Sequence, residues 1–151
     1  MEIIDNFVTE KDFNLLQNDK YTFFVLGRIL KGECNFIASD HNKIIICHSC
    51  KPFPLWIWTP DNVSQQEMET IYQILLENNF LTGEYTFNLK YDLATFLISR
   101  ASKDGKTLLL KKNMFAYDCP SPIEPADIQK ADGTFSKATI ADLEDFIDLW
   151  D

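Results

Sequence analysis

The feature that most constrains the fold is a helix start at Ser64-Gln65-Gln66-Glu67. A serine followed three residues later by a glutamate forms a capping box, in which each side chain accepts a hydrogen bond from the other residue's exposed backbone amide. Apolar residues then recur at helical spacing: Met68, Ile71, Tyr72 and Leu75. Residues three and four apart share one face of a helix. The pattern therefore predicts an amphipathic helix over 65–79.

Short apolar segments, separated by turn residues, lie on both sides of this helix. Three predicted strands precede it, at 35–39, 43–49 and 55–59. A strand over 80–87, a helix over about 91–102 and a long strand over 107–117 follow it. Near the N-terminus, Thr9-Glu10-Lys11-Asp12 indicates a helix start. Residues 20–31 are apolar on all sides, so periodicity leaves helix and buried strand open. This order predicts an α/β domain.

Charge is unevenly distributed along the chain. The net charge is −9, and residues 118–151 hold nine acids and two bases, so residues 1–117 carry only −2. No basic field is present for nucleic acid or an anionic membrane, and both partners are excluded. The sequence shows neither a secretory signal nor an apolar run of membrane-spanning length. We therefore expect a cytoplasmic protein whose four cysteines stay reduced.

The composition changes after residue 118. Prolines at 120, 122 and 125 and a glycine at 133 interrupt a polar stretch, which predicts a linker over 119–133. A short strand over 134–138 and a helix from Thr139 are expected next. The apolar stripe of that helix is Leu143, Phe146, Ile147 and Trp150. The favoured interpretation is a second domain that begins here and is cut off; the other is a terminal helix that folds back on the first domain.

Residues around this junction resemble those of two-part GNAT acetyltransferases. Met114-Phe115-Ala116-Tyr117, the linker, and then Ala138, Thr139 and Asp142 are similar to the family's "R-x-A-T-x-x-D" opening, with Ser136 in place of the arginine. The order of elements from residue 33 also resembles the GNAT fold after its first strand and opening helices. Phe24–Arg28 resembles an apolar first-domain segment that is helical in these proteins, which favours a helix within 20–31.

The resemblance also identifies a missing feature. GNAT catalytic domains hold the acetyl-CoA pyrophosphate on a Q/R-x-x-G-x-G/A loop between the fourth strand and the next helix, where glycines let backbone amides approach the phosphates. Residues 59–67 correspond to that loop, and they contain no glycine and no base, but two acids, Asp61 and Glu67. The resemblance therefore implies a degenerate first domain that binds no acetyl-CoA.

Few residues indicate chemistry of their own. Cys47-His48-Ser49-Cys50 has CxxC spacing, but Cys34, His41 and Cys119 are unpaired and the motif leads to a strand rather than a helix. We therefore predict ordinary strand-end thiols and no metal site, and metal or redox use is the alternative. His41 lies in a predicted turn and is expected to be solvated. Cys47 and His48 would point to opposite faces of a strand, which disfavours a nucleophile pair.

Two tryptophans are the only candidate site residues. Trp56 and Trp58 share one face of their predicted strand. We expect them to pack in the core against the 65–79 helix, and the alternative is an aromatic wall on the substrate side.

Together these observations predict a GNAT-like, mixed and mainly antiparallel sheet flanked by helices in residues 1–118, a linker over 119–133, and the start of a truncated catalytic domain over 134–151. The parent protein would transfer an acetyl group from acetyl-CoA to an amine. This chain alone would be inactive, with no catalytic residue to name, and its partner would be the missing C-terminal domain. The alternative is a non-catalytic interaction or dimerisation module that forms a homodimer.

Overall fold

The computed structural model describes residues 4–116, 133 and 137–142. The chain divides into two compact units, Met1–Asp118 and Cys119–Asp151. The second unit contains a short 3-10 turn, Ile140–Asp142, in which the backbone N–H of Thr139 donates to Asp142 Oδ2 at 2.6 Å. The predicted helix beyond Asp142, with its apolar stripe, lies outside the described residues. The fold below is that of the first unit.

A four-stranded sheet forms the centre of this unit. Its strands are β1 (Phe36–Ser39), β2 (Ile45–His48), β3 (Leu55–Trp58) and β4 (Phe87–Asn88), in the spatial order β1-β2-β3-β4. The first three strands pair antiparallel, whereas β4 is parallel to β3. The expected mixed, mainly antiparallel sheet flanked by helices is confirmed.

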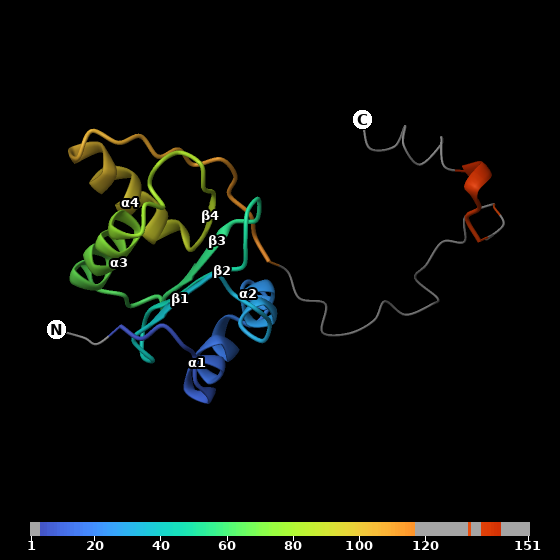
Figure 1. Cartoon of the computed structure of the whole chain (residues 1–151), viewed down its shortest axis with the longest axis horizontal. Helices are drawn as coiled ribbons and strands as arrows, with labels where there is room; N and C mark the ends of the chain where they lie inside the picture. The colour runs from blue at the N-terminus through green and yellow to red at the C-terminus, as the bar shows by residue number, and fades with distance from the viewer. Residues whose placement is uncertain (1–3, 117–132, 134–136, 143–151) are drawn as a thin grey trace. The chain divides into compact units, whose positions relative to one another are not determined.

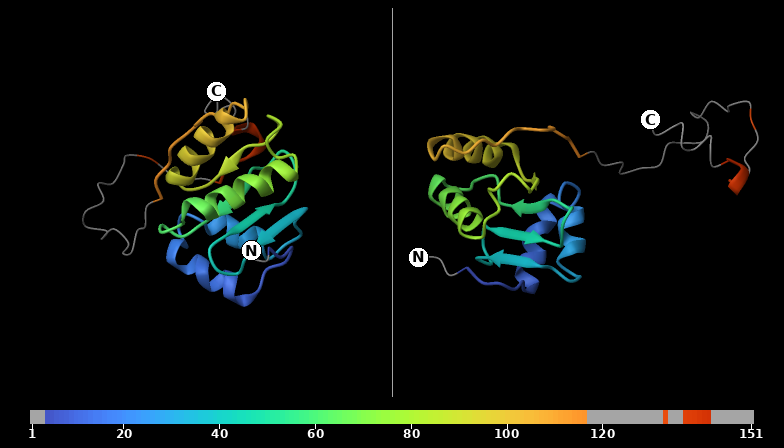
Figure 2. Two further views of the ribbon diagram at one scale, coloured as in Figure 1. Left: turned by 90° about the vertical axis from the view of Figure 1, so that its left-hand side faces the viewer. Right: turned by 45° about the horizontal axis from the view of Figure 1, so that its top comes forward.

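Helices cover both faces of the sheet (Figures 1 and 2). On one face lie α1 (Glu10–Leu15), the 3-10 helix η1 (Leu16–Asp19) and α2 (Phe24–Ile29). On the other face lie α3 (Gln65–Glu77) and α4 (Tyr91–Lys103). The expected helix within 20–31 is thus confirmed for the residues of α2. None of the helices in the described part of the chain is long and apolar enough to cross a membrane.

The sheet separates two hydrophobic cores. Side chains alternate between the faces of a strand, so Ile44 and Ile46 join the core under α3 and α4, while Ile45 and Cys47 join the core under α1 and α2. All four side chains are fully buried. Burial on both faces explains why the sequence of β2 is a continuous apolar run rather than an alternating one.

Two of the predicted strands are wrong for most of their length. Over 80–87 the chain turns: Asn79 has φ 58° and Gly83 has φ 90°, and only Phe87 belongs to a strand. Phe80 and Leu81 follow α3 and are buried in the core under α3 and α4, which accounts for their apolar character. Residues 107–116 form no strand, and large apolar side chains there are exposed. A strand needs a partner for its backbone hydrogen bonds, and β4, only two residues long, offers little edge.

Candidate functional site

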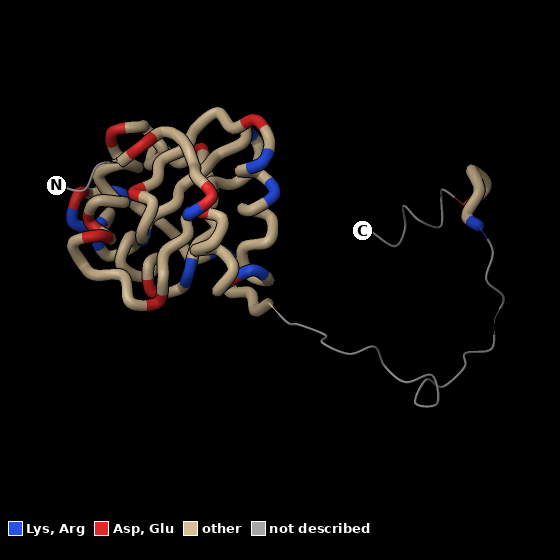
Figure 3. The backbone as a smooth tube through the Cα atoms, turned by 90° about the horizontal axis from the view of Figure 1, so that it is seen from below, with Lys and Arg blue, Asp and Glu red and all other residues tan. Residues whose placement is uncertain are grey.

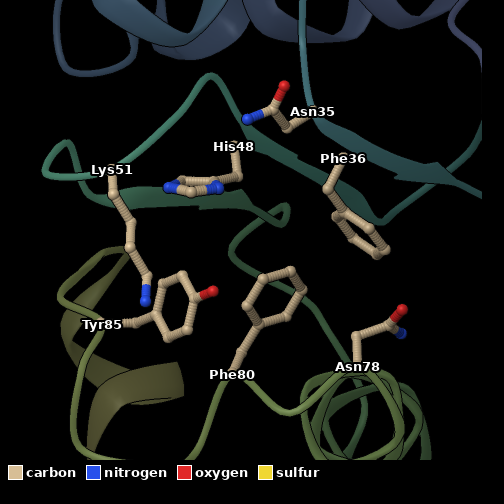
Figure 4. Close-up of a pocket in the computed structure, with 7 residues that line it drawn as sticks. All are labelled: Asn35, Phe36, His48, Lys51, Asn78, Phe80 and Tyr85. Atoms are coloured by element: carbon tan, nitrogen blue, oxygen red, sulfur yellow. The ribbon is translucent and has the colours of Figure 1, made fainter.

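A pocket of about 440 Å³ opens beside the end of β2, and Figure 4 shows its lining side chains. This volume lies within the range of about 300–1,000 Å³ that is typical of small-molecule sites. Its walls are mostly rings, with a few polar groups between them, a composition that is also typical of ligand sites. The lining residues are Asn35, Phe36, His48, Lys51, Asn78, Phe80 and Tyr85.

Local backbone features bring these residues together from distant parts of the chain. Helix α3 ends at Glu77, and Asn79 adopts a left-handed φ of 58°, which asparagine tolerates better than most residues. The chain therefore reverses, and Phe80 is placed under the sheet. Gly83, at φ 90°, turns the chain again and returns Tyr85 to the pocket. A non-glycine residue at Gly83 would be strained.

The aromatic walls pack edge to face. The ring centroids of Phe36 and Phe80 are 5.0 Å apart at 76°, and those of Phe80 and Tyr85 are 5.0 Å apart at 88°. His48 lies 5.5 Å from Tyr85 in a similar arrangement. Such pairs contribute about 0.5–1.5 kcal/mol each beyond the burial of their area. The rings therefore hold one another in place, and the pocket does not need a ligand to keep its shape.

The polar groups of the pocket suit binding rather than catalysis. The Nε2 N–H of His48 donates to the carbonyl of Phe53 at 3.1 Å, so this nitrogen is already used by the backbone. Lys51 pairs with Glu84, and its Nζ lies 4.8 Å from the centroid of Tyr85. The hydrogen bond to Glu84 raises the pKa of Lys51. What remains are the Asn35 amide, the Tyr85 hydroxyl and the Asn78 amide, whose Nδ2 already donates to the Ile74 carbonyl at 2.8 Å. These groups can orient a ligand but cannot act as a nucleophile–base pair.

Sequence reasoning missed this pocket. Three of its rings, Phe36, Phe80 and Tyr85, come from three separate segments, and the last two lie in a stretch predicted as a strand. The turn residues Asn79 and Gly83 were the available indication that the chain reverses there.

The tryptophans lie on the opposite face of the sheet. Trp58 is buried and Trp56 partly buried in the core under α1 and α2, so their expected packing against the 65–79 helix is wrong. Trp58 Nε1 donates to Asp19 Oδ2 at 2.8 Å, and Trp56 meets Phe23 edge to face. Neither lines the pocket, and their role as a substrate-side wall stays a prediction.

The CxxC residues point into different surroundings. Cys47 is buried in β2, whereas Cys50 is exposed after the strand. Burial, together with the neighbouring Cys34 thiol, raises the pKa of Cys47. Cys34 itself donates to the Ile29 carbonyl at 3.3 Å. No cluster of three or more metal-ligating side chains occurs in the described ranges 4–116, 133 and 137–142, and Cys119 lies outside them.

His41 is not solvated as expected, because its ring lies between two carboxylates. Nδ1 is 2.7 Å from Asp12 Oδ2 and Nε2 is 3.1 Å from Asp5 Oδ2. Asp12 also accepts hydrogen bonds from Ser39 Oγ at 2.5 Å and Thr9 N–H at 2.7 Å. Burial opposes ionisation of Asp12, but these hydrogen bonds outweigh it and lower the pKa of Asp12. The hydrogen bond to Asp12 raises the pKa of His41.

The Ser39–Asp12–His41 group does not form a nucleophile. A catalytic serine donates its proton to histidine, whereas the Ser39 hydroxyl donates to Asp12. The group instead ties the N-terminus of α1 to the β1–β2 hairpin. The helix start at Thr9-Glu10-Lys11-Asp12 was predicted from the sequence, and the structure shows a capping box there. The contact of Asp12 with His41, 29 residues away, was not predicted.

The connection from β3 to α3 is closed by the protein's own side chains. Ser64 N–H donates to Glu67 Oε2 at 2.6 Å and Glu67 N–H donates to Ser64 Oγ at 3.2 Å, which confirms the predicted capping box. Lys43 Nζ pairs with Glu67 Oε1 at 2.7 Å, and Lys90 Nζ with Asp61 Oδ1 at 2.7 Å. Both carboxylates of this connection are thus paired with lysines from other segments of the chain.

Comparisons of this chain with protein-family models, with curated proteins and with solved structures found no match.

Proposed function

We propose that this chain is the supporting, non-catalytic domain of an acetyl-CoA-dependent N-acetyltransferase of the GNAT type, and that the acetyl-CoA site belongs to a further domain. The observation that carries the proposal is the closed β3–α3 connection in a sheet whose order of elements resembles the GNAT fold. Three strands, α3, β4 and α4 follow one another as that resemblance implies, whereas described residues 107–116 do not form the final strand that it also implies.

The charges at the start of α3 favour a domain that does not itself bind acetyl-CoA. A helix N-terminus attracts phosphate because its first amides are free and its dipole is positive. Here the Ser64 hydroxyl and the Glu67 carboxylate occupy that end. Glu67 is held ionised: burial opposes this, but hydrogen bonds with Lys43 and Ser64 lower its pKa. A pyrophosphate would have to displace this carboxylate from the Ser64 amide and from Lys43.

The aromatic pocket supports a role on the acceptor side. It is concave, and the one amine in its lining, Lys51, is paired with Glu84, so it fits a domain that shapes the surroundings of a substrate while another domain carries out the chemistry. Under this proposal the acceptor amine, or the part of it remote from the reacting nitrogen, lies against Phe36, Phe80 and Tyr85.

Coenzyme A binding tests the proposal. The 151-residue chain is titrated with coenzyme A and acetyl-CoA by isothermal calorimetry, and by ¹⁵N NMR with attention to residues 59–67. We expect no saturable binding. For comparison, the gene is read beyond the codon for Asp151, and the longer protein that it encodes is titrated in the same way. We expect the longer protein to bind acetyl-CoA. Saturable shifts at residues 59–67, acetyl transfer by this chain alone, or a longer protein that fails to bind acetyl-CoA would overturn the proposal.

A further inference from the structure

A second, smaller hollow lies on the opposite side of the sheet from the aromatic pocket, between α1, η1 and α2. Its volume is about 150 Å³. We call it the α1–α2 groove, and its lining residues are Phe13, Leu16, Gln17, Lys20, Phe23, Phe24, Gly27, Arg28 and Lys31. Neither the GNAT resemblance nor the proposed acetyltransferase role assigns anything to it.

Three cations and no acid line the α1–α2 groove: Lys20, Arg28 and Lys31. Among the residues that the structure describes, none of the three forms an ion pair. By contrast, Lys51, Lys90 and Arg100 elsewhere in the unit each pair with a carboxylate. Residues 1–117 hold 14 acids and 12 bases, and Figure 3 shows the two signs interspersed along the backbone of the first unit. A groove with bases alone is therefore a local exception.

Aromatic rings accompany the cations. Arg28 lies over the Phe24 ring at 5.9 Å and Lys31 over the Phe13 ring at 6.0 Å. Phe24 is 61% exposed, whereas Phe23 and Leu16 are buried beneath. The groove thus offers apolar surface and positive charge to the same ligand.

Gly27 leaves the groove open. A Cβ placed on this helical residue would meet nothing within 4 Å, so the space above it is free. A closed apolar cavity of about 150 Å³ holds a benzene ring, and the groove has a similar volume but is open to solvent. The groove therefore has room for one aromatic ring beside Arg28 and Lys31, whereas Lys20 Nζ lies 4.9 Å from the centroid of Tyr21, which does not line the groove.

We infer that the α1–α2 groove binds a small aromatic carboxylate. The ring lies over Gly27 against Phe13 and Phe24, and the carboxylate accepts charge-assisted hydrogen bonds from Arg28 and Lys31. Either half of the ligand alone binds less well, because an aliphatic carboxylate leaves the rings uncovered and a neutral ring leaves the cations unpaired. This inference is independent of the proposed acetyltransferase role.

Benzoate is the probe that tests the inference. The full chain, labelled with ¹⁵N, is titrated with benzoate, benzamide and acetate in separate experiments. We expect benzoate to give saturable shifts confined to residues 10–31, with a dissociation constant on the order of 1 mM, as suits so small a ligand on an open surface. The affinity should fall as salt is raised, because the cations are exposed. Benzamide and acetate should bind at least fivefold more weakly.

Two variants and a matched control locate the site. Gly27→Leu fills the groove without a backbone clash, and Lys31→Glu reverses one charge; each should weaken benzoate binding at least fivefold. Lys112→Glu makes the same change in net charge at an exposed position outside the groove and should leave the affinity unchanged. Equal binding of benzamide, equal effects of the two lysine variants, or shifts that map to the aromatic pocket would each refute the inference.

Discussion

Replacement of Asp12 by asparagine removes one charge from the most interconnected polar group of the fold. Asp12 is fully buried and accepts four hydrogen bonds, from Thr9 N–H, Thr9 Oγ1, Ser39 Oγ and His41 Nδ1. All four partners donate to it. Asparagine keeps one accepting oxygen, and its new amide group can donate to Ser39 Oγ once that hydroxyl turns away.

The expected cost follows from what asparagine cannot replace. Buried hydrogen bonds to a charged group contribute about 1.5–3 kcal/mol each, and those between neutral groups about 1 kcal/mol. Three bonds onto Asp12 Oδ2 would become neutral in character, so we expect Asp12→Asn to lower the free energy of unfolding by about 2–3 kcal/mol near pH 5.5. Asp12→Ala leaves all four donors unmatched and should cost more, about 3–5 kcal/mol.

The dependence on pH separates this reasoning from a simple packing defect. The pKa of Asp12 is lowered in the folded state, so its contribution is present above its unfolded pKa of about 4 and is lost as pH falls through the folded value. The pKa of His41 is raised, so its contribution is present below about pH 6.5 and is lost as pH rises through the folded value. The difference between wild type and Asp12→Asn should therefore be largest between about pH 4.5 and 6.5.

Urea unfolding followed by tryptophan fluorescence measures this difference, since Trp58 is 2% exposed and reports loss of the core. Asp61→Asn is the matched control, because it removes an ion-paired carboxylate that is 93% exposed, and it should cost less than about 1 kcal/mol. A destabilisation by Asp12→Asn that is the same at pH 5.5 and pH 9, or no larger than that of the control, would refute the reasoning.

Three further predictions concern single side chains. Ser64→Ala should destabilise the fold by about 1 kcal/mol, because Glu67 N–H loses its cap; thermal unfolding checks this, and no change would mean that the cap is dispensable. Phe80→Ala should lower the free energy of unfolding by about 3–5 kcal/mol, since this ring is 6% exposed and packs between two others. Tyr85→Phe should leave it nearly unchanged, and equal losses of the two variants in urea unfolding would contradict the ring-packing argument. Cys50 should react with iodoacetamide in the native protein long before Cys47, whose pKa is raised by burial; mass spectrometry of timed digests measures the order, and comparable rates would show that Cys47 is accessible.

The elements that the sequence predicts best are those with local rules. The capping box at Ser64 and the apolar spacing after it place α3 almost to the residue, and the β-branched run before His48 places β2. Both signals depend on neighbours within a few positions, and no distant contact is needed to interpret them.

The failures come from interactions at a distance. Residues 80–87 and 107–116 carry strand-like composition, but apolar side chains do not reveal whether a partner strand exists. The predicted strand of the tryptophans is correct, but the predicted core is wrong. Alternation of side chains along a strand separates its two faces, but it does not identify the helices that cover each face. The aromatic pocket and the His41 contacts depend on side chains from separate segments, so no spacing rule could have found them.

The two-sided burial of β2 constrains how the length of this chain can change. In a strand packed on both faces, loss or gain of one residue before Ile44 would exchange the side chains presented to the two cores. The turn before it is fixed by Asp40, whose Oδ1 accepts from the backbone N–H groups of Asn42, Lys43 and Ile44. Single-residue insertions and deletions between Ser39 and Ile44 should therefore be selected against in descendants of this sequence, whereas substitutions at the exposed Asn42 should accumulate freely.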